Sequence, residues 1–171
     1  MKYFLVFAVI YTLLKKRNPF TFIKNVEFQW PLVILVSFGV QIALAFITIE
    51  TREKFEFILV LTFIGITIGL LKNKSIAGVK WIVVGAILNL TALILHGGLM
   101  PVSEAALKST GQDGDLTFET DSRHQLMQGS MDYWILGDWI PVIRYVLSPG
   151  DLIVGIGIVI LIYKNSSTRE A

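Results

Sequence analysis

The stretch PLVILVSFGVQIALAFITI, residues 31–49, decides the fold because it contains no charged residue. The hydrocarbon core of a bilayer is roughly 30 Å thick and is crossed by about 20 helical residues. This stretch alone therefore predicts a transmembrane helix.

Further apolar segments lie on both sides of this one, separated by charged clusters. The chain is 54% hydrophobic and only 16% charged, which is typical of membrane proteins. Tilt, interfacial residues or snorkelling lysines extend the shorter segments. We predict an all-α integral membrane bundle that forms a single domain over residues 1–171. About five transmembrane helices are expected near residues 3–14, 31–49, 55–71, 80–99 and 148–163.

Basic residues gather in alternate connections, whereas the long loop of about residues 100–147 is rich in Asp and Glu. Cytoplasmic loops of membrane proteins collect Lys and Arg, so this loop is predicted to be extracytoplasmic. The N-terminus is then outside and the C-terminus cytoplasmic. The basic residues are Lys15, Lys16, Arg17 and Lys24, then Lys72, Lys74 and Lys80, then Lys164 and Arg169.

Several classes of function are excluded by composition. The net charge of +2 averages two oppositely charged faces, so no nucleic acid is expected as a partner; anionic lipid headgroups fit the inner lysines better. The absence of cysteine excludes disulfides and thiolate catalysis. Asp113-Gly-Asp115 has spacing similar to a calcium loop but lacks the further ligands, so we predict no metal site. The sequence identifies no cofactor.

The end of the long loop carries charges among aromatic and apolar residues. Residues 134–147 suit an interfacial or re-entrant segment, which would hold Asp138 and Arg144 at membrane depth. A charge at that depth needs a partner. We therefore predict that Asp138 pairs with Arg144, or that either of them pairs with His124.

Two helix ends carry further candidate residues. His96, next to Gly97-Gly98, either bonds a backbone carbonyl or serves as a ligand-binding or proton-handling group. Ser148-Pro-Gly-Asp151 predicts a helix start, with Ser148 as the N-cap. Asp151 then either stabilises the helix N-terminus or takes part in chemistry.

Small and polar residues within the apolar segments predict helix packing. Gly65 and Gly69 have the spacing that lets two helix backbones approach closely, and Ser37 and Gln41 share one helix face. We interpret these positions as helix contacts.

The motifs His96-Gly-Gly-Leu-Met-Pro-Val102, His124-Gln-Leu-Met127, Leu136-Gly-Asp-Trp-Ile-Pro141 and Ser148-Pro-Gly-Asp151 resemble a family of small multi-pass bacterial membrane proteins. That family is known only as a domain of unknown function. The resemblance covers most of the chain, and its motifs lie between His96 and Gly157. It implies a bacterial cell-membrane protein with an unassigned role, and it supplies no catalytic residues.

Three functions fit these features. The first is binding, or helping to move, a small amphiphilic or lipid-linked ligand at an extracytoplasmic pocket. The second is a subunit or assembly factor that packs on a partner membrane protein in a larger complex, and the third is a membrane-embedded enzyme with Asp/His acid–base chemistry. The pocket hypothesis predicts that His96, His124, Asp138 and Arg144 converge within hydrogen-bonding distance of one cavity. The candidate ligand-binding residues are these four and Asp151.

Overall fold

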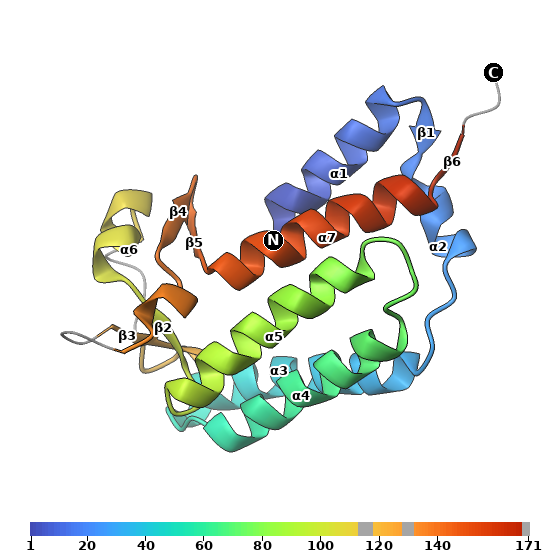
Figure 1. Cartoon of the computed structure of the whole chain (residues 1–171). Coiled ribbons are helices and arrows are strands. Elements are labelled where there is room, and N and C mark those ends of the chain that lie inside the picture. The colour runs from blue at the N-terminus through green and yellow to red at the C-terminus, as the bar shows by residue number, and fades with distance from the viewer. Residues whose placement is uncertain (113–117, 128–131, 169–171) are drawn as a thin grey trace.

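The computed structural model describes residues 1–112, 118–127 and 132–168, and long helices make up most of it (Figure 1). Each long helix coincides with a predicted apolar segment, because a helix satisfies its backbone groups within its own segment. The long helices are α1 (Lys2–Leu14), α3 (Pro31–Thr51), α4 (Glu56–Lys72), α5 (Val79–Leu95) and α7 (Pro149–Asn165).

Length separates α3 from the other long helices. It has 21 residues, whereas α1 has 13 and α4, α5 and α7 have 17 each. At 1.5 Å per residue, a helix of 17 residues is about 26 Å long and falls short of the roughly 30 Å hydrocarbon core. Within the described residues, only α3 is long and apolar enough to cross a membrane. The predicted helices are therefore present, but the prediction of five spans is not supported.

The prediction of an all-α fold holds in part, because the structure is mostly helical but three two-stranded sheets also form within the described residues. Gly97 and Gly98 adopt φ of 72° and 94° after α5, and Pro101 follows them, so the chain leaves the helix in an extended conformation. Extended backbone must bond to another segment. The pairing of residues 100–102 with residues 124–126 is therefore a consequence of the way in which α5 ends.

Two of these sheets lie at one end of the helices (Figure 1). We call the described part of residues 97–147 the cap. Residues 134–147, predicted as an interfacial or re-entrant segment, form a short 3-10 turn and a β-hairpin. The cap contains β2 (Met100–Val102) paired in parallel with β3 (His124–Leu126), the hairpin of β4 (Ile140–Val142) and β5 (Tyr145–Leu147), the helix α6 (Glu104–Thr110) and the turn η2 (Trp134–Leu136).

The opposite end, which we call the basal end, closes the bundle with a third sheet. There β1 (Arg17–Asn18) pairs antiparallel with β6 (Ser167–Thr168), next to the turn η1 (Pro19–Thr21) and the short helix α2 (Phe22–Asn25). The first and last helices are thus joined at this end by backbone hydrogen bonds.

Glycines bring α5 and α7 close together. Gly150 of α7 lies against Asn89 and against the carbonyl oxygen of Gly85, and Gly157 of α7 lies against Ile82. An added Cβ at either glycine of α7 would overlap α5. The first turn of α7 therefore sits directly on the half of α5 nearest the cap.

The interpretation of Gly65, Gly69, Ser37 and Gln41 as helix contacts is confirmed, and the helices that they join are α3 and α4. Gly65 and Gly69 face α3, and a Cβ added at Gly65 would lie 2.5 Å from the Oγ of Ser37. Gln41, one turn from Ser37, donates a hydrogen bond of 3.0 Å to the Oγ1 of Thr62. The small and polar residues of these helices thus serve packing within the chain.

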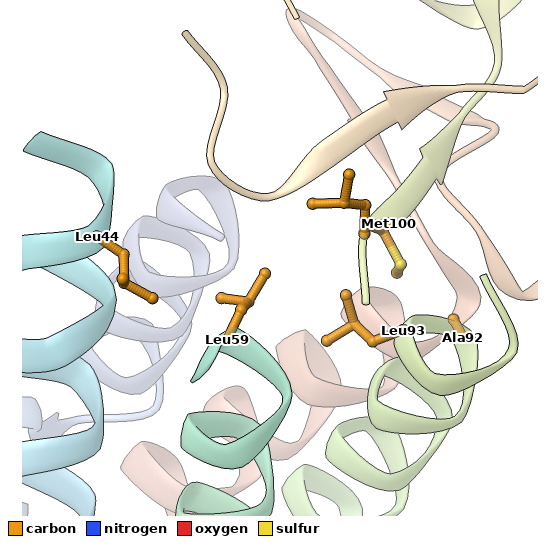
Figure 2. Packing of buried hydrophobic residues seen from close by; sticks show 6 residues of the cluster. Leu44, Leu59, Ala92, Leu93 and Met100 are labelled. Carbon is orange, nitrogen blue, oxygen red and sulfur yellow. The ribbon is translucent and has the colours of Figure 1, made fainter. Parts of the chain in front are cut away.

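A buried apolar cluster lies beneath the cap (Figure 2). It includes Leu44 of α3, Leu59 of α4, Ala92 and Leu93 of α5, and Met100 of β2. Burial of one such large side chain stabilises the fold by about 1.5–3 kcal/mol. Because Met100 belongs both to the cluster and to β2, this cluster fixes the cap on the bundle.

Candidate functional site

The loop before β3 holds a carboxylate against an imidazole. Asp121 accepts hydrogen bonds from the backbone N–H groups of Arg123 (2.8 Å) and His124 (3.1 Å), as aspartates in turns often do. The other carboxylate oxygen, Oδ2, lies 2.7 Å from Nδ1 of His124. Asp121 therefore fixes both the start of β3 and the orientation of the ring.

Asp138 lies on the other side of the ring, where β2 holds its backbone. Its N–H donates to the carbonyl of Pro101 and its carbonyl accepts from the N–H of Ser103, both at 2.8 Å. Gly137 permits this close approach, since a Cβ there would lie 2.5 Å from the Pro101 oxygen. Oδ2 of Asp138 is 3.4 Å from Nε2 of His124. The imidazole thus lies between two carboxylates.

The carboxylate of Asp138 is buried and incompletely paired. Its side chain is 7% exposed, and its Oδ1 has no hydrogen-bond partner among the residues that the structure describes. A buried polar atom without a partner costs free energy. This oxygen is therefore a candidate acceptor for a donor on a ligand.

The environment of these three side chains shifts their protonation. Burial opposes the charged form of His124, but its hydrogen bonds with Asp121 and Asp138 outweigh burial and raise its pKa to about 9. Burial also opposes ionisation of Asp121, yet the hydrogen bond from His124 and two backbone N–H groups lower its pKa to about 2. Burial raises the pKa of Asp138, and the hydrogen bond from His124 offsets this only in part. At neutral pH the ring is an imidazolium that donates to both carboxylates.

Two cavities flank the pair of His124 and Asp138. The smaller has a volume of about 40 Å³, and the larger, on the side of Asp121, has about 140 Å³. Phe63, Asn89, Leu93, Met100, Arg123, His124, Asp138 and Asp151 line the smaller cavity. Val102, Leu107, Gln112, Phe118, Asp121, His124, Asp138, Tyr145 and Val146 line the larger one.

The floor of the smaller cavity is the contact between α5 and α7. Asn89 of α5 donates a hydrogen bond of 2.8 Å to Oδ1 of Asp151, and its own Oδ1 accepts one of 2.9 Å from the hydroxyl of Ser148. The Ser148 oxygen accepts from the N–H of Asp151 at 2.9 Å, which confirms the predicted N-cap. The Asp151 carboxylate is thus held at the positive end of the helix dipole.

An apolar groove of about 330 Å³ lies between α1 and α7, next to the hairpin of the cap. Its walls come from both helices and from one hairpin residue: Tyr3, Phe4, Phe7, Val142, Ile156, Val159 and Ile160. The groove ends where the cap begins, so it lies close to the larger cavity.

The predicted convergence of His96, His124, Asp138 and Arg144 is wrong, because only His124 and Asp138 of these four line the smaller cavity. Asp151, the fifth candidate, lines it with them. His96 does not line it, because its ring nitrogens lie 2.6 Å from the carbonyl oxygen of Ala92 and 2.9 Å from that of Asp132. His96 thus contacts backbone carbonyl groups, which is the first of the two roles considered for it.

Arg144 is also away from the two cavities. It is exposed in the two-residue turn between β4 and β5, so the predicted pair of Asp138 and Arg144 is wrong. The alternative pair, Asp138 with His124, is present. The hairpin explains this outcome, because its turn carries Arg144 away from the residue that precedes β4.

Sequence reasoning missed Asp121 and Arg123 as parts of the site. The signal for Asp121 was its position three residues before His124, which suits a side chain that bonds the backbone of a turn. Arg123 had no signal, since its guanidinium lies over the ring of Phe63 (5.6 Å to the centroid) in a distant helix.

The described residues contain no group of three or more His, Asp or Glu side chains that could hold a metal ion. Asp113 and Asp115, whose spacing is similar to that of a calcium loop, lie outside the described residues.

Comparison with known proteins shows the family. A model described as "Family of unknown function (DUF5317)" matches residues 25–163, and the chain belongs to this family. An uncharacterized protein of Thermotoga maritima is 32% identical over 110 residues, a match that covers 61% of this chain and 62% of that protein. No solved structure matches the chain. The predicted resemblance to an uncharacterised family is confirmed, and α1 lies outside the matched range.

Proposed function

We propose that this DUF5317 protein is a membrane-embedded binding protein whose cap holds the head group of a small amphiphilic or lipid-linked molecule. The apolar chain of that molecule lies in the groove between α1 and α7. One observation carries the proposal: the larger polar cavity and the apolar groove meet at Tyr145 and Tyr3. The two spaces together offer a single molecule both a polar and an apolar site.

The junction is formed by two tyrosine rings. Tyr145 lines the cavity, Tyr3 lines the groove, and their ring centroids are 5.5 Å apart in an edge-to-face contact. Val142, which faces Tyr145 across the hairpin, also lines the groove. Cavity and groove therefore lie on the two sides of this tyrosine pair, and a molecule that occupies both displaces the rings from their contact.

The surface of the helices supports a membrane environment. Leu32, Leu35 and Phe46 of α3 are 72%, 64% and 69% exposed, and they belong to a long apolar helix face. Soluble proteins rarely expose an apolar patch larger than a few hundred Å². Helices shorter than the bilayer are accommodated by local thinning at fractions of a kcal/mol per Å.

The two ends of the bundle differ in charge in the way that the orientation rule for membrane proteins requires. This difference supports a bacterial cell-membrane protein with its N-terminus and cap outside and its C-terminus in the cytoplasm. The basal end carries Lys15, Lys16, Arg17, Lys24, Lys72, Lys74, Lys80 and Lys164 against Glu27, whereas the described cap carries Glu104, Glu119, Asp121, Asp132 and Asp138 against Lys108, Arg123 and Arg144.

Native mass spectrometry of the protein, extracted gently from its own membrane, tests the proposal. We expect a defined bound mass that is lost in Asp138→Asn, which alters the head site, and in Val159→Trp, which fills the groove. Two matched variants should keep the mass. Asp132→Asn makes the same chemical change on an exposed loop residue, and Leu35→Trp places the same bulk on an exposed face of α3.

A protein without bound mass would overturn the proposal, and so would a mass that is lost equally from the test and control variants. A co-purifying protein retained by all variants would favour a subunit or assembly factor. Against that alternative, two glycines of α7 that could have formed a free contact face are occupied within the chain. Gly155 lies against Phe4 and Gly157 against Ile82.

The imidazole between two carboxylates favours a second candidate, a membrane-embedded enzyme with Asp/His acid–base chemistry. With its pKa raised to about 9, His124 is protonated at neutral pH and would act as an acid. Chemical conversion of the bound molecule by the wild type, absent in His124→Gln, would establish this function in place of simple binding.

A further inference from the structure

We infer that the head group held at the cap carries a primary ammonium group, which donates hydrogen bonds to Asp138. This inference deepens the proposed function and rests on it for the apolar chain. It stands on one juxtaposition: the buried, unpartnered Oδ1 of Asp138 belongs to a side chain that lines a small cavity together with a second carboxylate, Asp151.

The size of the smaller cavity limits what can enter it. Its volume is about 40 Å³, whereas a single water needs roughly 10–15 Å³ measured in this way. An ammonium group and its adjoining methylene fit this space, and a phosphate or a sugar does not. Phe63, Leu93 and Met100 supply an apolar wall for the methylene.

The charges around the two cavities favour a cation. Of the two cationic side chains that line them, His124 is shared between Asp121 at 2.7 Å and Asp138 at 3.4 Å, and Arg123 lies over the ring of Phe63. Asp138 and Asp151 both line the smaller cavity, and Oδ1 of Asp138 has no partner among the described residues. An anionic head group would bring a like charge against a buried carboxylate, which is costly, whereas an ammonium group forms a charge-assisted hydrogen bond with it.

The route to this site is short. His124 and Asp138 line both cavities, so a head group in the larger cavity meets the Asp138 carboxylate at the boundary between them. Asn89 fixes the second carboxylate by its hydrogen bond to Oδ1 of Asp151. The acceptors are therefore held in place before the ligand arrives, which lowers the entropic cost of binding.

Binding of four probes to the full-length protein in phosphatidylcholine nanodiscs tests the inference. The probes are octylammonium, octyltrimethylammonium, octanol and octanoate, all with the same chain. We expect octylammonium to bind at least tenfold more tightly than the other three, because it alone carries a charged N–H donor. Asp138→Asn should abolish this preference, and the matched change Asp132→Asn should preserve it. Asp151→Asn, which is expected to weaken the binding of octylammonium, gives a second readout if Asp138→Asn fails to fold.

The outcomes separate the inference from the proposed function. Equal binding of all four probes, weakened throughout by Val159→Trp, would overturn the ammonium group and leave amphiphile binding intact. Butylammonium that binds through Asp138 as tightly as octylammonium would keep the ammonium site and overturn the role of the groove. If phosphatidylethanolamine in the nanodisc displaces octylammonium, the natural ligand is a lipid head group. If octylammonium stays bound, the natural ligand is a free amine.

Discussion

Asn73 at the basal end and Asp138 in the cap are both buried polar side chains, in residues that are 1% and 5% exposed. Asn73 accepts from the N–H of Gln29 and donates to the carbonyls of Gln29 and Gly69. Asp138 leaves one carboxylate oxygen without a partner in the described part of the chain. The comparison separates a polar group that completes the fold from one that is free to receive a ligand.

The polar side chains around Asn73 and those around Asp138 differ in the same way. At the basal end Asn165 donates to the carbonyls of Ala77 and Leu161, and Arg17 donates to that of Tyr163. These side chains satisfy the ends of helices. In the cap, by contrast, acidic and basic side chains line the two cavities. Burial alone therefore does not identify a candidate site; Asp138 differs because its unsatisfied acceptor is a carboxylate oxygen of a side chain that lines a cavity.

The largest effect is expected at the basal end of the contact between α5 and α7. Gly78 has a φ of 92°, and an added Cβ would lie 2.7 Å from the Cα of Leu161. Gly78→Ala combines overlap with backbone atoms and a left-handed conformation, so we expect a loss of about 4 kcal/mol in the free energy of unfolding. Thermal unfolding in detergent, followed by circular dichroism, measures this loss.

Gly97 provides the control in the cap. It has a φ of 72° but open space where a Cβ would lie. Gly97→Ala should therefore cost only about 1–2 kcal/mol, the penalty of the left-handed conformation. Equal losses in the free energy of unfolding for Gly78→Ala and Gly97→Ala would show that the close contact with α7 does not explain the effect at Gly78.

An intermediate effect tests the comparison of Asn73 with Asp138 directly. Asn73→Ala removes three hydrogen bonds and leaves backbone groups of Gln29 and Gly69 unpaired, so we expect a loss of about 3 kcal/mol. Asp138→Asn keeps the shape of the side chain, and His124 retains Asp121 as its partner, so the expected loss is that of a single hydrogen bond, about 1 kcal/mol. Unfolding midpoints of both variants in the same detergent give the two values. A large loss for Asp138→Asn would mean that Asp138 is structural as well.

The smallest effect is the dependence of stability on pH, because the His124 side chain is 32% exposed and water screens its interactions. Its pKa rises from 6.5 to about 9 on folding, so its contribution is complete below pH 6.5 and is lost as the pH rises through 9. Asp121, whose pKa falls from 3.8 to about 2, stabilises the fold above pH 3.8 and loses this contribution as the pH falls toward 2. Unfolding temperatures across both ranges measure these slopes.

His124→Gln provides the reference for both slopes, since it removes the titrating ring and the partner of Asp121. The difference between wild type and variant should shrink between pH 6.5 and 9. A constant difference over that range would show that the ring does not carry its charge in the folded protein.

Local signals in the sequence were enough to predict the long helices and the start of α7, which borders the candidate site. Long apolar segments locate the five long helices, and Ser148 ahead of Pro149 marks the start of α7 through bonds made within a few residues. The pair of His124 and Asp138 was reached as one of several alternatives, from the requirement that a charge at membrane depth has a partner.

The remaining features depend on contacts between distant segments. β2 and β3 have three residues each and pair across more than twenty positions of sequence, so neither shows a strand pattern of its own. The turn that displaces Arg144 places Ile143 at a φ of 57°, where glycine or asparagine is usual, and so it gives no hairpin signal. The sequence did not fix the number of spans. An apolar helix of 17 residues, such as α4, is slightly too short for the bilayer, but the bilayer can adapt to such a helix at a modest cost in free energy.

The two carboxylates of the smaller cavity are carried by different parts of the molecule. Asp138 is bonded to β2, which continues from α5, whereas Asp151 belongs to the first turn of α7. The separation of the carboxylates therefore depends on the position of α7 along α5, which Asn89 fixes by its bonds to Ser148 and Asp151 and which Ile82 fixes by packing against Gly157. Because the far end of α7 bonds to Arg17, the geometry of the smaller cavity is tied to the basal end of the bundle.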